Sequence, residues 1–307
     1  MRVLVTGANG YLGAAVADVL RESGYDVVGL IHNDRSRVPD GVPVRCADLL
    51  DPRSLRAAVQ DIDVVCHLAG LTRVRESYTD PERYFDVNAV GTAALLRAME
   101  SAGVAAMVFA STAAIYGAPE QQPMAEDLPD NPPHPYAASK RAAEQSIEAE
   151  ADRGKLAAVI LRLFNVAGGP DPDSSRILPR ILSAAAGRSA LTVHGDGSSI
   201  RDYVHITDAA SAFSTAISCM PEPGKCVRYN IGSGVGISVR QLIDVVSQVT
   251  GRDIPIEHRP AVAQPPRLVS DSDRARRELC WTATNSDIRS IVREAWSCRS
   301  TPHERPE

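Results

Sequence analysis

The sequence predicts an α/β fold, a doubly wound parallel sheet with a smaller C-terminal α/β lobe. Short apolar runs rich in β-branched residues alternate with segments of helical periodicity through the first half of the chain. These runs are hydrophobic along their whole length, as expected for strands that are buried on both faces. The first run leads directly into a glycine-rich turn and a helix. This alternation is typical of a parallel sheet covered by helices on both sides.

The elements of this sheet can be assigned in order along the chain. The expected strands occupy residues 2–7, 26–31, 42–48, 63–70, 106–112 and 157–165. The helices expected between them occupy residues 11–24, 51–60, 88–103 and 139–152. Gly24 and Gly103 end two of these helices, because glycine tolerates the left-handed conformation that often closes a helix.

The pattern changes after about residue 168. The loop-like stretch "GGPDPDSS" precedes a helical segment, residues 191–213 alternate polar and apolar positions, and a further helix is expected at residues 239–251. Some strands of this part are expected to return to the main sheet. The sequence therefore predicts a main domain at residues 1–167, joined by segments of about 204–236, and a smaller lobe at residues 168–307.

Composition is ordinary for a globular protein and limits the class of partner. Hydrophobic residues make up 44% of the 307 residues and charged residues 23%, and the formal net charge is −5. No basic stripe is present, so neither nucleic acid nor an acidic membrane surface is expected as a partner. No run of about 18 apolar residues occurs that would span a membrane.

The cysteines and histidines give no sign of a metal site. The six cysteines form no CxxC pair, and the seven histidines are scattered without the spacing of metal ligands. The strand-like run "RVLVTG" begins at residue 2, so no signal peptide is expected. We therefore expect a cytosolic protein with reduced thiols.

The turn after the first strand, "TGANGYLG", favours a bound dinucleotide. Gly7 allows the tight turn from strand to helix, Gly10 lets the backbone approach a pyrophosphate, and Gly13 lets the helix pack on the strand. The N-terminus of the helix then faces the phosphates. Because the motif stands between a strand and a helix, we expect a dinucleotide here rather than a glycine-rich turn without a ligand.

The end of the second strand leaves the choice between NAD and NADP open. An acidic residue at this place would hold the ribose hydroxyls and exclude a 2′-phosphate. The strand ends instead at Ile31, which is followed by His32, Asn33 and Asp34. Asp34 could serve from a shifted position, whereas His32 or Arg35 could bind a phosphate.

The end of the third strand offers a further contact for the cofactor. Asp48 and Leu49 follow this strand, and we interpret them as candidates for contact with the adenine. The alternative for Asp48 is a cap of its own loop.

The stretch "HPYAASK", residues 134–140, carries chemistry that fits this setting. Tyr136 and Lys140 are four positions apart, so on a helix they share one face. A phenol can pass a proton to or from a substrate oxygen while hydride moves at the carbon. Its ordinary pKa of about 10 is too high for this near neutral pH, but a nearby ammonium and the positive nicotinamide favour the phenolate. Thr112, in "FASTAAIYG" after the fifth strand, would supply a hydroxyl to the same oxygen.

The motifs "TGANGYLG", "HLAG", "STAAIYG", "PYAASK", "FNVAGG" and "RDYVHITD" together resemble the extended short-chain dehydrogenase/reductase family. Within it, the sequence is most similar to UDP-glucose 4-epimerases and related nucleotide-sugar enzymes, and "AGLTRVRES" with "YFDVNAVGT" strengthens this comparison. The resemblance covers nearly the whole chain, and the motifs occur in the family's order. It implies a Rossmann-type NAD-binding domain and a lobe that binds a nucleotide sugar.

The resemblance also implies a homodimer, paired through helices that match residues 82–101 and 136–151. In the second helix, the residues expected to allow close packing are Ala142, Ala143, Ile147 and Ala149.

The site residues implied by the resemblance centre on the catalytic trio of Thr112, Tyr136 and Lys140. The residues expected to bind the cofactor are Gly7, Asn9, Gly10, Tyr11, Leu12, His32, Asn33, Asp48, Leu49, Leu68, Ala69, Gly70, Asn88, Tyr136, Lys140 and Phe164, with His67 in the same channel. The residues expected to bind the substrate are Thr72, Thr112, Ala113, Tyr136, Asn165, Arg176, Ile177, His194, Arg201 and Arg259.

Several of these substrate residues have a structural alternative. Asn165 is expected beside the sugar diphosphate, with Arg201 and Arg259 on its phosphates, a task that suits the fork of an arginine. Asn165 could instead cap its own turn, Arg201 could pair with Asp202, and Arg259 could be a solvated loop charge. His194 lies where the family often places an aromatic ring against the base, and the alternative is a plain loop histidine.

Two departures from the family pattern bear on function. Sugar 4,6-dehydratases carry an Asp-Glu pair just after the catalytic threonine, whereas this chain has Ala113 and Ala114. The proton carriers for water elimination are therefore missing. The glycine and acid usual after Arg259 are replaced by Ala261 and Val262, so Arg267 is a further candidate for the phosphates.

The sequence therefore favours a nucleotide-sugar 4-epimerase that inverts C4 of a UDP-hexose with tightly held NAD. Tyr136 would take the proton from the 4-hydroxyl, Thr112 would position the oxygen, and Lys140 would hold the ribose and favour the phenolate. An NADP-dependent sugar ketoreductase is the alternative, because Ile31 and Arg35 do not exclude NADP. A dinucleotide sensor without catalysis is a third interpretation, which the complete catalytic trio disfavours.

Overall fold

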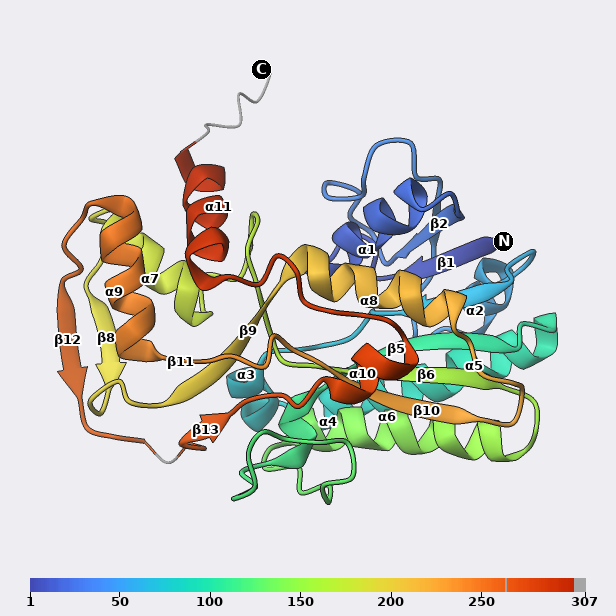
Figure 1. Ribbon diagram of the computed structural model, residues 1–307. Coiled ribbons are helices and arrows are strands. Elements are labelled where there is room, and N and C mark those ends of the chain that lie inside the picture. Colours follow the sequence, from blue (N-terminus) through green and yellow to red (C-terminus); the bar gives the residue numbers. More distant parts are fainter. Residues whose placement is uncertain (263, 301–307) are drawn as a thin grey trace.

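The main unit of the molecule is a seven-stranded parallel sheet, which confirms the predicted fold class. The computed structural model describes residues 1–262 and 264–300. Along the sheet the strands follow the order β10-β6-β5-β4-β1-β2-β3 (Figure 1). They are β1 (Arg2–Thr6), β2 (Asp26–Ile31), β3 (Val44–Cys46), β4 (Val64–His67), β5 (Ala106–Thr112), β6 (Ala157–Leu163) and β10 (Cys226–Ile231).

The strand order reverses between β1 and β4. In sheets of this kind, ligands bind outside the carboxyl ends of the strands at such a point, because the connecting loops leave the sheet in opposite directions there.

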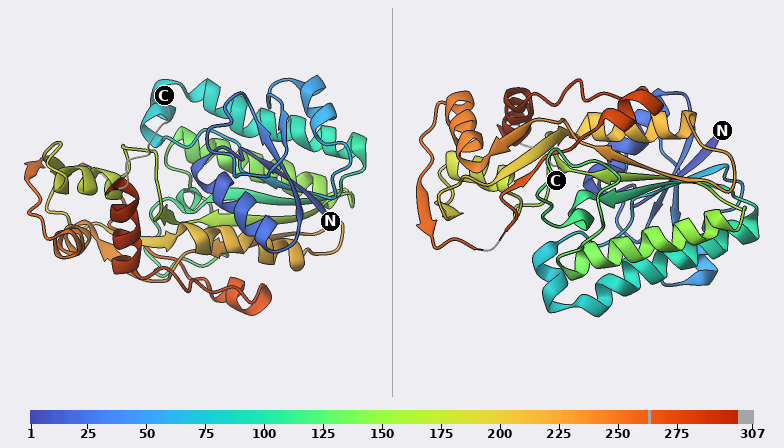
Figure 2. Two further views of the ribbon diagram at one scale, coloured as in Figure 1. Left: turned by 90° about the horizontal axis from the view of Figure 1, so that it is seen from above. Right: turned by 60° about the horizontal axis from the view of Figure 1, so that its bottom comes forward.

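Helices cover both faces of the sheet (Figures 1 and 2). α1 (Tyr11–Glu22) and α8 (Ile206–Ser218) lie on one face. The other face carries α2 (Pro52–Ala58), α5 (Gly91–Ala102) and α6 (Pro135–Asp152). A hydrophobic cluster fills each interface, which explains why the strands are apolar on both sides.

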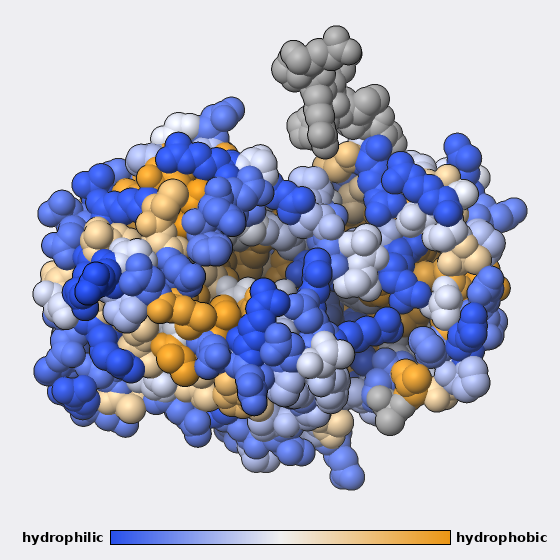
Figure 3. Space-filling model, turned by 180° about the vertical axis from the view of Figure 1, so that it is seen from behind, coloured by the Kyte–Doolittle hydropathy of each residue, from blue (hydrophilic) through white to orange (hydrophobic). Residues whose placement is uncertain are grey.

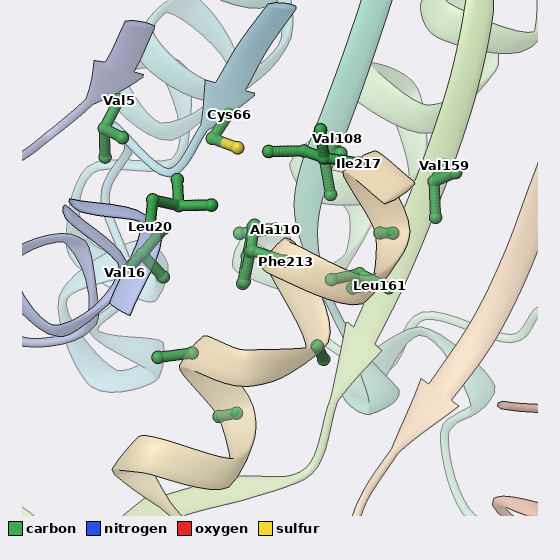
Figure 4. Packing of buried hydrophobic residues seen from close by; sticks show 14 of the residues in the cluster. Val5, Val16, Leu20, Cys66, Val108, Ala110, Val159, Leu161, Phe213 and Ile217 are labelled. Carbon is green, nitrogen blue, oxygen red and sulfur yellow. The ribbon is translucent and has the colours of Figure 1, made fainter. Parts of the chain in front are cut away.

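Alternating residues of each strand enter opposite clusters. Val108 and Val159 point toward α8, which supplies Phe213 to the same cluster (Figure 4). Their neighbours in sequence, Met107 and Ala158, belong to the cluster beneath α5 and α6. The main sheet is therefore the shared centre of two cores.

Short helices fill the connection between β4 and α5. They are α3 (Val74–Thr79), α4 (Pro81–Phe85) and a π-helical turn at Asp86–Val90. After β5 the chain makes a 3-10 turn at Ala113–Tyr116, where the Thr112 hydroxyl oxygen accepts the N–H of Ala114 at 3.2 Å.

A smaller lobe follows the main sheet and is built on two short sheets. In one, β9 pairs with β7, β11 and β13, and in the other β8 pairs with β12. These strands are β7 (Asn165–Ala167), β8 (Leu191–His194), β9 (Ile200–His205), β11 (Gly236–Ser238), β12 (Ile256–Arg259) and β13 (Arg267–Leu268). The helices of the lobe, which share a third hydrophobic cluster, are α7 (Ile177–Ala185), α9 (Val239–Thr250) and α11 (Ile288–Ser300).

Parts of the second half of the chain lie on the main sheet. β10 pairs with β6 in parallel, α8 packs against α1, and α10 (Asp273–Glu278) lies beside β10. The end of the predicted lobe, residues 301–307, is outside the described residues. Within the described ranges, no helix combines the length and apolar character needed to cross a membrane.

α6 begins earlier than expected, at Pro135 rather than Ser139. Proline suits the first helical position, where no N–H is needed, and the His134 ring nitrogen accepts the N–H of Ala137 at 3.1 Å. Tyr136 therefore lies in the first turn of α6.

The alternating pattern at residues 191–213 describes strands only in its first part. From residue 206 onward the chain is helical, beginning where the His205 ring nitrogen accepts the N–H of Thr207 at 3.2 Å. The buried positions there, which include Ala209, Ala210 and Phe213, have helical spacing. Contact with the main sheet selects this helix over a continued strand.

Candidate active site

A cavity of about 530 Å³ lies at the carboxyl ends of β1, β4, β5 and β6. Figure 3, seen from behind, shows that the surface is hollowed between the main sheet unit and the lobe. The cavity brings together many of the predicted site residues. Those that line it are Gly7, Gly10, Tyr11, Leu12, Leu68, Gly70, Thr72, Thr112, Tyr136, Lys140, Phe164, Asn165, Arg176 and Ile177.

The glycine turn has the geometry that the sequence predicts. Gly7 has φ +69°, a conformation that favours glycine, and its N–H donates to the Leu30 carbonyl at 2.8 Å. Gly10 begins α1, and no side chain caps this helix end, so its first N–H groups remain available to an anion. A Cβ on Gly13 would lie 2.0 Å from the Gly7 carbonyl oxygen, so the close packing of α1 on the turn requires glycine there.

The carboxylate nearest the end of β2 is that of Asp34, in the loop that follows the strand. Ile31 is buried in the core, and His32 is the first exposed residue after it. The Asp34 carboxylate accepts hydrogen bonds from the N–H and hydroxyl of Ser36 at 2.8 and 2.9 Å. Asn9 donates to the Asp34 carbonyl at 2.8 Å and ties this loop to the glycine turn.

Asp48 caps its own loop, as the alternative interpretation proposed. Its Oδ1 accepts the N–H of Leu50 at 2.9 Å, and its Oδ2 lies 3.4 Å from His32 Nε2. The predicted cofactor residues that do not line the cavity are Asn9, His32, Asn33, Asp48, Leu49, Ala69 and Asn88.

The three predicted catalytic residues face the same cavity. Burial raises the pKa of the Tyr136 phenol, and a hydrogen bond with Thr112 acts in the opposite direction. Burial lowers the pKa of Lys140 to about 7, while Glu144 one turn later raises it. The Lys140 ammonium lies 4.1 Å from the centre of the Phe109 ring, which favours the charged form.

His67 was expected in the cofactor channel, but it is 1% exposed and does not line the cavity. Its Nδ1 lies 2.7 Å from the Thr6 hydroxyl, which accepts the N–H groups of Leu68 and Ala69 and therefore donates to His67. Its Nε2 lies 3.0 Å from the hydroxyl of Thr92. Burial lowers the pKa of His67 to about 3, so the neutral ring fixes the loop after β4.

Asn88 is also buried rather than in contact with the cavity, since it is 2% exposed. Its Oδ1 accepts the N–H of Leu71 at 2.8 Å, and its Nδ2 donates to the Leu71 carbonyl and to the Ser139 hydroxyl at 3.0 and 2.9 Å. Asn88 therefore joins the loop after β4 to the helix that carries Tyr136. Like His67, it is bonded within the protein around the loop after β4.

A second cavity of about 260 Å³ continues the first one into the lobe, and the two share Asn165, Ile177 and Tyr203. Of the predicted substrate residues, it adds His194 and Arg201. Asn165 donates from Nδ2 to the Asp202 carbonyl at 3.1 Å.

Arg201 does not form the ion pair with Asp202 that was considered as an alternative. Its guanidinium donates to the carbonyls of Ile200 and Pro265 at 2.8 and 2.9 Å, whereas the Asp202 carboxylate is buried and accepts from Ser233 and other neighbours. Burial lowers the pKa of Arg201. The charge of Arg201 is therefore left without a carboxylate partner in the described chain, at the edge of the cavity.

Arg259, in contrast, lines neither cavity. It is exposed on β12, 3.8 Å from Glu257, which fits the alternative of a solvated charge. Arg267, on β13, is also exposed and lines neither cavity. Ala113 is buried in a cluster with Phe164, and it is Ala114 that reaches the main cavity.

Sequence patterns missed several residues of the site. Asp171 lines the main cavity and lies 3.3 Å from Arg176, whose guanidinium stands 5.1 Å from the Tyr11 ring. Arg75 and Arg180 line the second cavity and add to the positive charge of Arg201 there. Arg180 is one turn from Arg176 in the helical pattern "RILPR", so helical spacing was the signal that could have found it.

Comparisons with known proteins agree with this geometry. Residues 3–232 match the profile of the NAD dependent epimerase/dehydratase family. A UDP-glucose 4-epimerase of Streptomyces lividans is 39% identical, over 98% of this chain and 96% of that one. The crystal structure of a UDP-glucose-4-epimerase from Stenotrophomonas maltophila with bound NAD and formylated UDP-arabinopyranose has a TM-score of 0.92 at 32% identity, covering 98% of both chains. MoeE5 in complex with UDP-glucuronic acid and NAD has a TM-score of 0.89 at 30% identity, covering 98% of this chain and 100% of that one.

Proposed function

Since this chain belongs to the NAD dependent epimerase/dehydratase family, we propose that it is an NAD-dependent UDP-sugar 4-epimerase. The observation that carries the proposal is the convergence of Thr112, Tyr136 and Lys140 on a cavity that begins at the dinucleotide turn. The relatives named above are UDP-glucose 4-epimerases, or were solved with NAD and UDP-sugars bound.

The residues present fit NAD. The turn at Gly7 and Gly10 and the uncapped N-terminus of α1 would hold the pyrophosphate, and Lys140 would hold the nicotinamide ribose. Bound NAD supplies a hydride acceptor that returns the same hydride at the end of the cycle.

Tyr136 is the group that moves the proton. Its phenolate takes the proton of the sugar 4-hydroxyl, and the phenol returns it when the C4 ketone is reduced. Thr112 holds the same oxygen through its hydroxyl, and the positive charge of Arg176 lowers the pKa of the phenol. Lys140, one helical turn after Tyr136, adds a second positive charge that would favour the phenolate. Ala113 and Ala114 bring only methyl groups, so no acid–base pair is present beside Thr112 to eliminate water.

Inversion at C4 requires the 4-keto sugar to present its opposite face while the nucleotide stays bound. We assign the diphosphate to the second cavity, where Arg201, Arg180 and Arg75 lie together. The predicted role of Arg259 on the phosphates is not part of this assignment, because Arg259 lies outside both cavities. This arrangement grips the nucleotide in the lobe and leaves the sugar free to turn beside Tyr136.

A label experiment tests this proposal. The purified protein is incubated with a UDP-hexose deuterated at C4, without added cofactor, and the product is analysed by mass spectrometry. An epimerase converts the sugar to its C4 epimer with the deuterium retained, because the same hydride returns. Loss of the label, or a requirement for stoichiometric NADPH, would contradict the proposal.

The alternative of an NADP-dependent ketoreductase is favoured by one observation. The buried Ile31 stands where an acid would exclude a 2′-phosphate, and the exposed Asp34 three residues later is hydrogen-bonded to Ser36. Dissociation constants of NAD and NADP on the stripped protein distinguish the two. We expect a modest preference for NAD, and a clear preference for NADP would support the reductase.

We also propose that the protein is a homodimer, paired through residues 82–101 and 136–151. Large apolar side chains are exposed along the first segment, with Phe85 39% and Val90 53% exposed. Ala143 and Ile147 were expected to pack against the partner, but both are fully buried in the core of their own protomer. Sedimentation should give a dimer at micromolar concentration, and Val90→Glu should shift it toward monomer, because the charge would be buried in the interface.

We further infer a cytosolic location. All six cysteines are free thiols, as expected for a protein of a reducing compartment. Fractionation of expressing cells, with the protein in the cytosolic fraction, is the expected result.

A further inference from the structure

A buried cluster of charges lies behind the catalytic side chains. Arg162 of β6 and Glu144 of α6 both have no exposed surface. Nε and Nη2 of Arg162 donate to the two Glu144 oxygens at 3.0 and 2.6 Å, and Nη1 lies 2.7 Å from Asp130. The Ser111 hydroxyl donates to Glu144 Oε1 at 2.5 Å. Three elements, β5, α6 and β6, therefore meet at one carboxylate.

Each member of this cluster adjoins a part of the candidate active site. Ser111 precedes Thr112 on β5, and it lies opposite Arg162 in the register of β5 with β6. Ser111 and Thr112 both line the main cavity, and the Ser111 hydroxyl joins this wall of the cavity to Glu144. Glu144 lies one helical turn after Lys140, on the same face of α6.

Stability alone does not explain the cluster. Two charges removed from water lose hydration, and apolar residues of similar volume at such places are often as stabilising or more so. The guanidinium of Arg162 also stands 4.6 Å from the centre of the Tyr116 ring. This cation–π contact lowers the cost of burying Arg162, and it would form without Glu144. The position of the carboxylate beside Lys140 suggests a function for it.

The surroundings of Lys140 contain one fully buried carboxylate among the described residues, that of Glu144. From β4 the Lys140 ammonium is approached by His67, which is neutral, and from β5 by the Phe109 ring. From its own helix it is approached by Glu144, while Tyr136 lies one turn earlier on the same face of α6. Tyr136 itself is faced by Arg176, which lowers the pKa of the phenol, and by Tyr84, which raises it. Two positive charges also stand beside Glu144, since Arg162 of β6 lies 2.6 Å and Arg141 of α6 3.7 Å from its carboxylate.

We propose that Glu144, held in place by Ser111 and Arg162, is a positioning residue that keeps Lys140 charged beside Tyr136. This inference rests on the proposed function, because it assigns the ammonium the task of favouring the phenolate. Burial and Glu144 act on the pKa of Lys140 in opposite directions. Without the carboxylate, Lys140 loses its proton at lower pH, and the phenolate of Tyr136 forms only at higher pH.

The test measures the pKa of Tyr136 directly in the NAD-bound protein, from the ultraviolet absorbance of tyrosinate. Subtraction of the same titration in Tyr136→Phe identifies this tyrosine among the others. The variants are Glu144→Gln and the double variant Glu144→Gln/Arg162→Met. Glu148→Gln is the matched control, because Glu148 also lies on α6 and pairs with two arginines, Arg141 of α6 and Arg228 of β10, but it is two turns from Lys140.

We expect the Tyr136 pKa to rise by about one unit in Glu144→Gln, a tenfold loss of phenolate at a given pH. The acid limb of kcat/KM should shift in the same direction, with KM nearly unchanged. In Glu144→Gln, Arg162 keeps Asp130 as a carboxylate partner but loses the bidentate pair with Glu144. The double variant removes this partly paired buried charge, so it should recover part of the stability but keep the raised pKa. Glu148→Gln should titrate like the wild type.

An unchanged Tyr136 pKa in Glu144→Gln, or a return to the wild-type pKa in the double variant, would show that the cluster only supports the fold. The same conclusion would follow if neither variant folds. The titration does not depend on turnover, so it remains informative if the wild type fails to epimerise a UDP-sugar, a result that would count against the proposed function alone.

Discussion

Gly13→Ala should lower the affinity for NAD more than a glycine-to-alanine change at an open position of the surface. The added Cβ would lie 2.0 Å from the Gly7 carbonyl oxygen and 2.8 Å from the Gly7 carbonyl carbon. Real Cβ atoms essentially never come closer than 3.0 Å, so α1 and the turn must separate by at least about 1 Å. Both partners are backbone, so no flexible side chain can absorb the shift.

Two losses follow from this separation. Forced packing of one extra methyl group costs about 1–3 kcal/mol of folding free energy. The turn at Gly7 and the first N–H groups of α1 would also no longer converge on one pyrophosphate. Loss of one hydrogen bond to a charged phosphate, about 1.5–3 kcal/mol, weakens NAD binding roughly ten- to a hundredfold.

The assay is NAD binding to the stripped protein by calorimetry, together with thermal unfolding. Gly24→Ala is the matched control, because it adds the same methyl group just after the end of α1. A Cβ on Gly24, which has φ +86°, would meet nothing within 4 Å. It should lower stability through backbone strain and leave NAD affinity unchanged. Wild-type NAD affinity in Gly13→Ala would refute the reasoning.

Three further outcomes are expected. Tyr136→Phe should lower turnover by at least about 10²-fold while NAD stays bound, and near-normal activity in a kinetic assay would contradict the acid–base role. Lys140→Met in the stripped protein should raise the melting temperature below about pH 7, since the buried ammonium with its lowered pKa then costs stability. The gain in melting temperature should shrink as the pH rises from about 7 to 10.5, the pKa of Lys140 in the folded protein and in the unfolded chain. Between these values the folded wild type has already lost the lysine proton, so the cost of the buried ammonium disappears. Thr6→Val should leave His67 Nδ1 without its donor, and a fall in the melting temperature with slower turnover is expected.

The strands of the main sheet and most of its helices could be predicted from local pattern. Apolar runs such as the one at residues 26–31 are hydrophobic on both faces, and this required helices above and below. β10 was harder to assign, because its partner β6 lies more than sixty residues earlier and only the fold brings them together. The helical start of α8 was missed for a similar reason, since its apolar residues are selected by contact with the sheet.

The cavity residues were predictable where a motif fixes a backbone geometry or a reactive group. The turn at Gly7 and the pair of Tyr136 and Lys140 are of this kind, since spacing along one element sets their positions. Asn88 was predicted beside the cofactor, but the sequence does not show that Leu71 and Ser139 satisfy its hydrogen bonds away from the cavity.

By itself the sequence determined the reactive groups and the elements that carry them, because a strand, a glycine turn and a helical spacing of four are short-range properties. The tertiary structure decided which charges meet. Arg201 and Arg259 look alike in the sequence, yet one borders a cavity and the other faces solvent. Glu144 and Arg162 are eighteen positions apart and pair at 2.6 Å only because α6 packs across β5 and β6. Burial and distance set the strength of such charges, and both are properties of the packed chain.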